Sequence, residues 1–149
     1  MADDAMAEHL RRLREIINQH GWALQEVAPV HEQDLPFTYT AGLAAAGLPE
    51  LIIVGLPSTV AAGYLNHFAK LSLATELTAG DRHTIQLGRT ALTWQIGEVS
   101  AASSAEYLRV AHVVHGESVR ALQLVWPDAN GLLPGDAGYQ PSAGQPLLA

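Results

Sequence analysis

The sequence predicts an α+β fold in which about three helices pack on a mainly antiparallel sheet. Three observations support this prediction. The apolar pattern switches along the chain between helical spacing and strand-like runs. The expected elements follow the order α-β-β-β-α-β-β-α-β, without the strict alternation that is typical of a parallel doubly wound sheet. The 149 residues match the length of a single domain, which we expect to span residues 1–149.

The first half of the chain is predicted to contain one helix and three strands. Within the N-terminal segment, residues 1–20, apolar side chains recur at helical spacing over about residues 4–19, and Gly21 is placed to end the helix. The strands are expected at residues 22–27, 37–43 and 51–56. The last of these is a continuous apolar run, so we expect it to be buried on both faces.

A second helix is expected to begin at Ser58, which has a side chain suited to an N-cap. A hairpin of residues 83–87 and 91–99 follows, joined near Gly88 and Arg89. This arrangement adds two neighbouring antiparallel strands to the sheet.

A third helix is expected near Ser103, which has capping-box spacing to Glu106, and Gly116 is placed to end it. The last strand is expected over residues 119–126. Residues 130–149 contain four Gly and three Pro, which predicts an irregular tail that wraps around the domain.

Composition limits the classes of function. The net charge is -7 and the chain has only eight Lys and Arg residues, so we expect no nucleic-acid partner. There is no cysteine, which excludes disulfides and thiolate chemistry. The N-terminus lacks a signal-peptide pattern and no apolar run is long enough for a membrane helix, so a cytoplasmic protein without membrane association is expected. The low charged content, 15 %, favours a self-associating surface and a homodimer.

Several sequence blocks together resemble the DUF4262 family of small, mostly actinobacterial proteins of unknown function. The blocks occur in the family's order: His20-Gly21-Trp22, Phe37-Thr-Tyr-Thr-Ala-Gly-Leu43, Pro49-Glu50-Leu51-Ile-Ile-Val-Gly-Leu56 and Gln123-Leu-Val-Trp-Pro-Asp128, with Gly131 and Pro134 after them. The resemblance runs from about His20 to Leu148. Family members often have a Trp where Gly135 follows Pro134, and if that Trp lines a pocket, the pocket here is wider. The resemblance implies little about activity.

Glu50 is the first candidate site residue, because it stands at the border of a very apolar strand. Partial burial would raise its pKa toward the range of a general base. The alternative is a charge at the strand edge paired with Arg89 or Arg120. Tyr39 and Thr40 are neighbours in a strand and must face opposite sides, so one of them is expected to face a pocket.

Gln123, Trp126 and Asp128 form a second candidate group at the end of the last strand. A cleft beside Tyr39 would make Gln123 and Asp128 binding or catalytic groups. The alternative is that Asp128 caps a turn and Trp126 packs in the core.

The chain has seven His residues, so we consider whether their spacing in the sequence fits a metal site. His112 and His115 are three residues apart, and His67 or Glu117 could add a ligand, but no further ligand lies at a diagnostic spacing. We therefore predict no metal. The sequence also lacks a G-x-S-x-G motif and a glycine-rich phosphate loop.

The prediction is a small-molecule-binding protein whose pocket lies between the strand of residues 37–43, the Pro49-Glu50 corner and the end of the strand of residues 123–128. If it is an enzyme, the expected chemistry is acid–base catalysis without metal or cofactor. The catalytic candidates are Glu50, Tyr39, Asp128 and His67, and the binding candidates are Thr40, Gly42, Asn66, Gln123 and Trp126. The alternatives are a non-catalytic interaction module and, by loose analogy to flavin-reductase split barrels, a flavin-binding protein.

Overall fold

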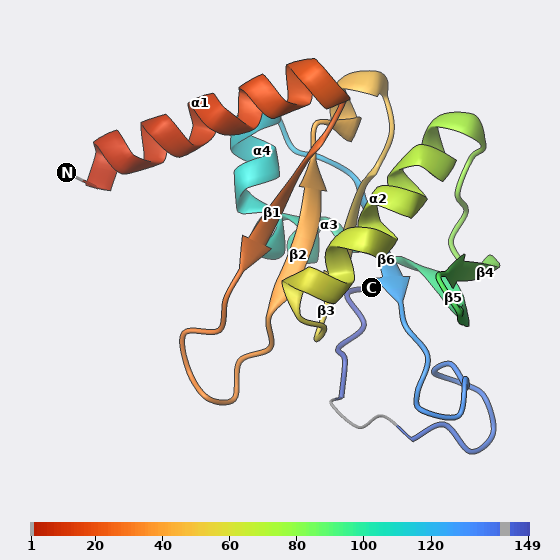
Figure 1. Cartoon of the computed structure of the whole chain (residues 1–149). Coiled ribbons are helices and arrows are strands. Elements are labelled where there is room, and N and C mark those ends of the chain that lie inside the picture. Colours follow the sequence, from red (N-terminus) through yellow and green to blue (C-terminus); the bar gives the residue numbers. More distant parts are fainter. Residues whose placement is uncertain (1, 141–143) are drawn as a thin grey trace.

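The computed structural model describes residues 2–140 and 144–149 and places six strands in one sheet (Figure 1). The strands are β1 (Ala23–Val27), β2 (Phe37–Ala41), β3 (Glu50–Val54), β4 (Arg82–Leu87), β5 (Thr90–Glu98) and β6 (Ala121–Val125). Their order across the sheet is β1-β2-β3-β6-β5-β4. Within this sheet β3 and β6 run parallel, and the other neighbouring pairs are antiparallel. The predicted α+β fold with a mainly antiparallel sheet is confirmed.

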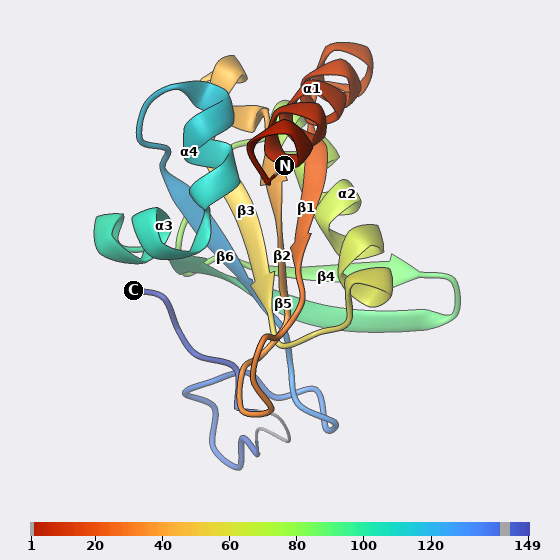
Figure 2. The ribbon, with the colours of Figure 1, turned by 90° about the vertical axis from the view of Figure 1, so that its left-hand side faces the viewer.

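Helices cover both faces of the sheet (Figure 2). They are α1 (Ala2–His20), the 3-10 helix η1 (Leu43–Ala46), α2 (Ser58–Ala74), α3 (Ala101–Tyr107) and α4 (Arg109–His115). The α2 helix packs on one face against β2 and β3, α4 packs on the other face against β2, and α1 packs against β1. No helix among the described residues is long and apolar enough to cross a membrane.

The centre of the sheet separates two apolar cores. Side chains alternate along β3, so Leu51 and Ile53 join the core under α2, while Ile52 and Val54 join the core under α4. All five residues of β3 are buried, which confirms the prediction that this strand is buried on both faces. Tyr39 on β2 belongs to the α4 side, opposite its neighbour Thr40.

Two predicted N-caps are wrong. The α2 helix begins at Ser58, as predicted, but its N-cap is Pro57, and no side chain caps this end. The α3 helix begins at Ala101, after the N-cap Ser100, whose Oγ accepts the Ser103 N–H at 3.1 Å. Ser100 and Ser103 both have side chains that can cap a helix. The sequence spacing alone did not show which of the two serines is the N-cap.

The predicted third helix is interrupted. Leu108, with φ −95° and ψ 45°, leaves the helical conformation and separates α3 from α4. The Tyr39 hydroxyl oxygen accepts the Val110 N–H at 3.0 Å, which satisfies a backbone donor left free by the break. The end at Gly116 is as predicted, in the left-handed conformation with φ 84°.

Candidate functional site

The Glu50 side chain is fully buried and holds the loop that leads into η1. Its Oε1 accepts the Thr40 hydroxyl at 2.8 Å and the Leu43 N–H at 3.1 Å. Its Oε2 accepts the Gly42 N–H at 3.0 Å and the Ala44 N–H at 3.2 Å. These four donors occupy the acceptor positions of both carboxylate oxygens. Two of the predicted binding residues, Thr40 and Gly42, therefore donate hydrogen bonds to the Glu50 carboxylate.

This geometry bears on both interpretations of Glu50. No Arg or Lys nitrogen lies within ion-pair distance of its carboxylate in the described part of the chain, and Arg120 instead donates to the Gly47 carbonyl at 3.2 Å. The pairing with Arg89 or Arg120 is therefore wrong, because three backbone N–H groups and Thr40 replace a cation. Burial raises the pKa of Glu50, and its four hydrogen bonds act in the opposite direction.

The Gln123–Asp128 strand end does not meet the Pro49-Glu50 corner. In the parallel β3–β6 pair, Glu50 lies opposite Ala121, at the start of β6. Asp128 follows the other end of β6. The expected pocket between these segments would require the two strands to run antiparallel. Asp128 and Glu50 therefore lie at opposite ends of the sheet.

Asp128 organises the turn after β6. Its Oδ1 accepts the N–H groups of Asn130 and Leu132, both at 2.9 Å, and its Oδ2 accepts the Gln140 N–H at 2.8 Å. The hydrogen bond from Gln140 contributes most to lowering the pKa of Asp128. The neighbouring Trp126 is buried and its indole N–H donates to the Val54 carbonyl at 2.8 Å. These contacts match the turn-cap and core alternatives for the two residues.

Gln123 holds the C-terminal segment against the sheet. Its Nε2 donates to the Pro146 carbonyl at 2.8 Å, and its Oε1 accepts the Leu148 N–H at 3.0 Å. The side chain is 1 % exposed. Both the NH₂ group and the oxygen of the Gln123 amide thus bond backbone groups of the C-terminal segment. Gln123 therefore holds this segment in place and does not face a ligand site.

Gln123→Leu is expected to release this segment. The substitution keeps the side-chain size but leaves the Pro146 carbonyl and the Leu148 N–H without partners, at a cost of about 2 kcal/mol. Hydrogen exchange at the Leu148 amide should accelerate by more than tenfold, while exchange within β3 changes less. Unchanged protection of Leu148 would show that the tail is held by other contacts.

His67 and Asn66 lie on α2, across the sheet from Tyr39. The Asn66 Oδ1 accepts the Trp22 indole N–H at 2.9 Å, and the His67 ring packs edge-on against Phe68 with centroids 5.8 Å apart. The His112 Nε2 forms a hydrogen bond with the Ser104 Oγ at 3.0 Å. No group of three or more His, Asp or Glu side chains that could hold a metal occurs among the described residues.

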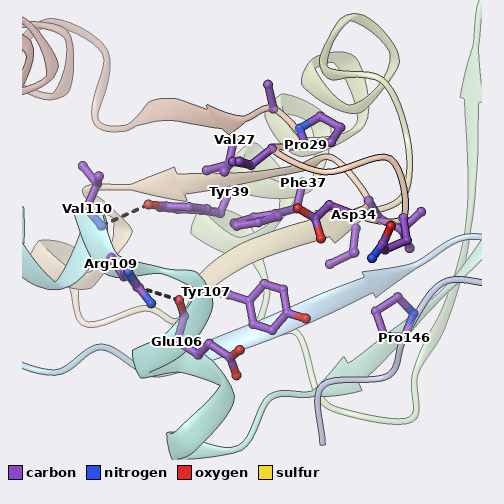
Figure 3. A pocket seen from close by; sticks show the side chains of 15 residues that line it. Val27, Pro29, Asp34, Phe37, Tyr39, Glu106, Tyr107, Arg109, Val110 and Pro146 are labelled. Carbon is purple, nitrogen blue, oxygen red and sulfur yellow. Dashed lines mark hydrogen bonds between the residues drawn. The ribbon is translucent and has the colours of Figure 1, made fainter.

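A hollow lies on the α4 face, between the β1–β2 loop and the α3–α4 break (Figure 3). Its cavity is about 580 Å³. We call it the aromatic pocket and define it by six of its lining residues, Val27, Asp34, Phe37, Tyr39, Tyr107 and Arg109. Tyr39 is the one sequence-predicted site residue among the lining residues.

Three rings form the apolar body of the aromatic pocket. Phe37 and Tyr39 are successive residues on the same face of β2, with stacked rings 6.2 Å apart. Tyr107, from the end of α3, meets Phe37 edge-on at 5.1 Å. Sequence reasoning missed Phe37, Tyr107, Asp34 and Arg109. The alternation Phe37-x-Tyr39 was a signal for two aromatic rings on one face, but nothing indicated that Tyr107 would join them.

Comparisons with known proteins identify a family, but the description of that family names no activity. The family model described as Domain of unknown function (DUF4262) matches residues 16–140. No curated protein and no solved structure matches the chain.

Proposed function

The chain belongs to the DUF4262 family, for which no activity is defined, and we propose that it binds a small molecule with a flat apolar body in the aromatic pocket. The single observation that carries this proposal is the set of three aromatic rings from Phe37, Tyr39 and Tyr107 around a cavity of about 580 Å³. Cavities of about 300–1,000 Å³ lined by apolar and aromatic side chains with a few polar groups are typical of ligand sites.

The surroundings of the pocket support the same proposal. Val30, in the β1–β2 loop that lines the pocket, is 83 % exposed, so its apolar side chain is available for contact at the rim. Pro146 contributes a wall from the C-terminal segment that Gln123 holds in place. The lining residues therefore come from a loop, three strands, two helices and the tail, which together border a ligand-sized hollow.

The proposal concerns binding rather than catalysis. The acid–base candidates Glu50, Asp128 and His67 do not line this pocket, and the Glu50 oxygens are already occupied by four donors. Tyr39 is the one catalytic candidate that does. The four predicted catalytic residues therefore do not meet in this pocket, and we propose no reaction there.

Tyr107→Ala is expected to weaken binding of planar aromatic compounds by about tenfold, because it removes a ring that a bound ligand would contact. The measurement is ligand-observed NMR with a set of aromatic fragments, followed by titration of the compounds that bind. Tyr139→Ala is the matched control, since Tyr139 is also partly buried but lies outside the pocket.

Equal loss of binding in both variants, or no binding of any fragment by the unmodified protein, would contradict the proposal. Native mass spectrometry of the purified protein adds two readouts. A retained small molecule would identify the ligand class directly, and the number of copies per particle tests the self-association expected from the low charged content.

A further inference from the structure

We infer that a single buried water molecule links β4 to β5 beneath α2, where it accepts a hydrogen bond from the Trp94 indole and donates one to the His83 imidazole. Neither residue lines the aromatic pocket, so this inference is independent of the proposed function. It rests on two buried polar atoms that have no hydrogen-bond partner within the described chain.

These two atoms are exceptions in the structure. Among the described residues, the Trp94 Nε1 and the His83 Nε2 are the only buried side-chain polar atoms without a partner. The other two indoles follow the rule, since Trp22 donates to the Asn66 Oδ1 at 2.9 Å and Trp126 donates to the Val54 carbonyl at 2.8 Å. A buried donor or acceptor without a partner loses its hydrogen bonds to solvent and gains nothing in return, so we expect both atoms to be satisfied.

The fold brings the two side chains together. His83 on β4 lies directly opposite Trp94 on β5 in the antiparallel pair, so both side chains are on the same face of the sheet. Both rings also pack against Phe68 of α2, each with its centroid 6.0 Å from the Phe68 centroid. The two rings therefore border the same small region between the hairpin and α2.

The chemistry of the two groups is complementary. An indole N–H can only donate a hydrogen bond, and the unprotonated nitrogen of a neutral imidazole can only accept one. Trp94 and His83 form no direct hydrogen bond with each other. A molecule that accepts from Trp94 and donates to His83 satisfies both groups, and water does this with one oxygen and one proton.

Burial selects water over a larger ligand. Trp94 is 0 % exposed, so a solute does not reach its indole from solution. A water enclosed during folding needs only the space of one molecule and at least two polar partners. The inference also assigns the tautomer of His83, because an accepting Nε2 places the ring proton on Nδ1.

The test is water-selective NMR on the full chain labelled with ¹⁵N. We expect a nuclear Overhauser cross-peak between water and the Trp94 indole proton, with the sign of a water that stays bound for longer than the protein takes to tumble. Trp126 is the internal control, because its indole is also buried but donates to a carbonyl, and it should show no such cross-peak. Long-range ¹H–¹⁵N spectra should show that the His83 Nε2 carries no proton.

A variant then assigns the water to this pair. In His83→Leu the water keeps only one of its two partners, so the cross-peak at Trp94 should weaken by about fivefold or more. His67→Leu is the matched control, because the His67 ring also packs edge-on against Phe68, with centroids 5.8 Å apart, but comes from α2 itself. The cross-peak should persist in this control, and melting curves confirm that both variants fold.

Three outcomes would overturn the inference. The first is the absence of a water cross-peak at the Trp94 indole of the unmodified protein, a measurement that needs no variant. The second is a proton on the His83 Nε2, or a scalar coupling across a direct hydrogen bond between the Trp94 and His83 nitrogens. The third is a cross-peak of full strength in His83→Leu, which would mean that the water at Trp94 has other partners.

Discussion

Glu50→Gln is expected to lower the free energy of unfolding by about 3 kcal/mol, and the melting temperature by about 10 °C. The carboxylate accepts four hydrogen bonds, two at each oxygen. In the variant an amide NH₂ replaces one oxygen and must face two donors, which are left without an acceptor in a buried site. Chemical denaturation followed by circular dichroism measures the change.

Glu98→Gln is the matched control, because Glu98 also lies at a strand end but is exposed, and its change in stability should be small. Thr40→Val provides an intermediate case, since it removes one donor to Glu50 and the acceptor of the Leu51 N–H at 2.8 Å. A Glu50→Gln protein as stable as the Glu98→Gln control would mean that the buried carboxylate does not support this loop.

The role of Glu50 was only partly readable from the sequence. Its position before a continuous apolar strand suggested partial burial of the carboxylate as one of two alternatives, and the side chain is fully buried. Its partners were not predictable in the same way, because they are mostly backbone N–H groups. Those groups converge only when Gly42 takes φ 118° and the following residues form η1. Backbone donors leave no residue-type signal, so Arg89 and Arg120 were the only partners for the carboxylate that the sequence suggested.

The location of the pocket depended on topology that local patterns do not specify. Element types followed from periodicity, but β3 and β6 pair in parallel, which sends Asp128 to the opposite end of the sheet from Glu50. The aromatic pocket also needs the break at Leu108, which positions Tyr107 and Arg109 on either side of it. Apolar periodicity continued through Leu108, so the sequence predicted one helix and did not indicate a pocket there.

Gly42→Ala is expected to destabilise the protein by about 3 kcal/mol, from two causes that can be separated. The φ of Gly42 is 118°, in a region that residues with a Cβ rarely adopt. A Cβ at this position would also lie 2.9 Å from the Ile17 Cγ2 and 3.1 Å from the Gly21 carbonyl oxygen. The substitution therefore strains the loop that supplies Glu50 with its donors and pushes α1 away from that loop.

Gly47→Ala isolates the backbone cause, because Gly47 also has a positive φ, 78°, but a Cβ there meets nothing within 4 Å. We expect Gly47→Ala to cost about 1 kcal/mol, so the difference between the two variants estimates the cost of the close approach to α1. The measurement is chemical denaturation under identical conditions. Equal destabilisation in both variants would mean that α1 yields without cost and that the positive φ alone accounts for glycine at position 42.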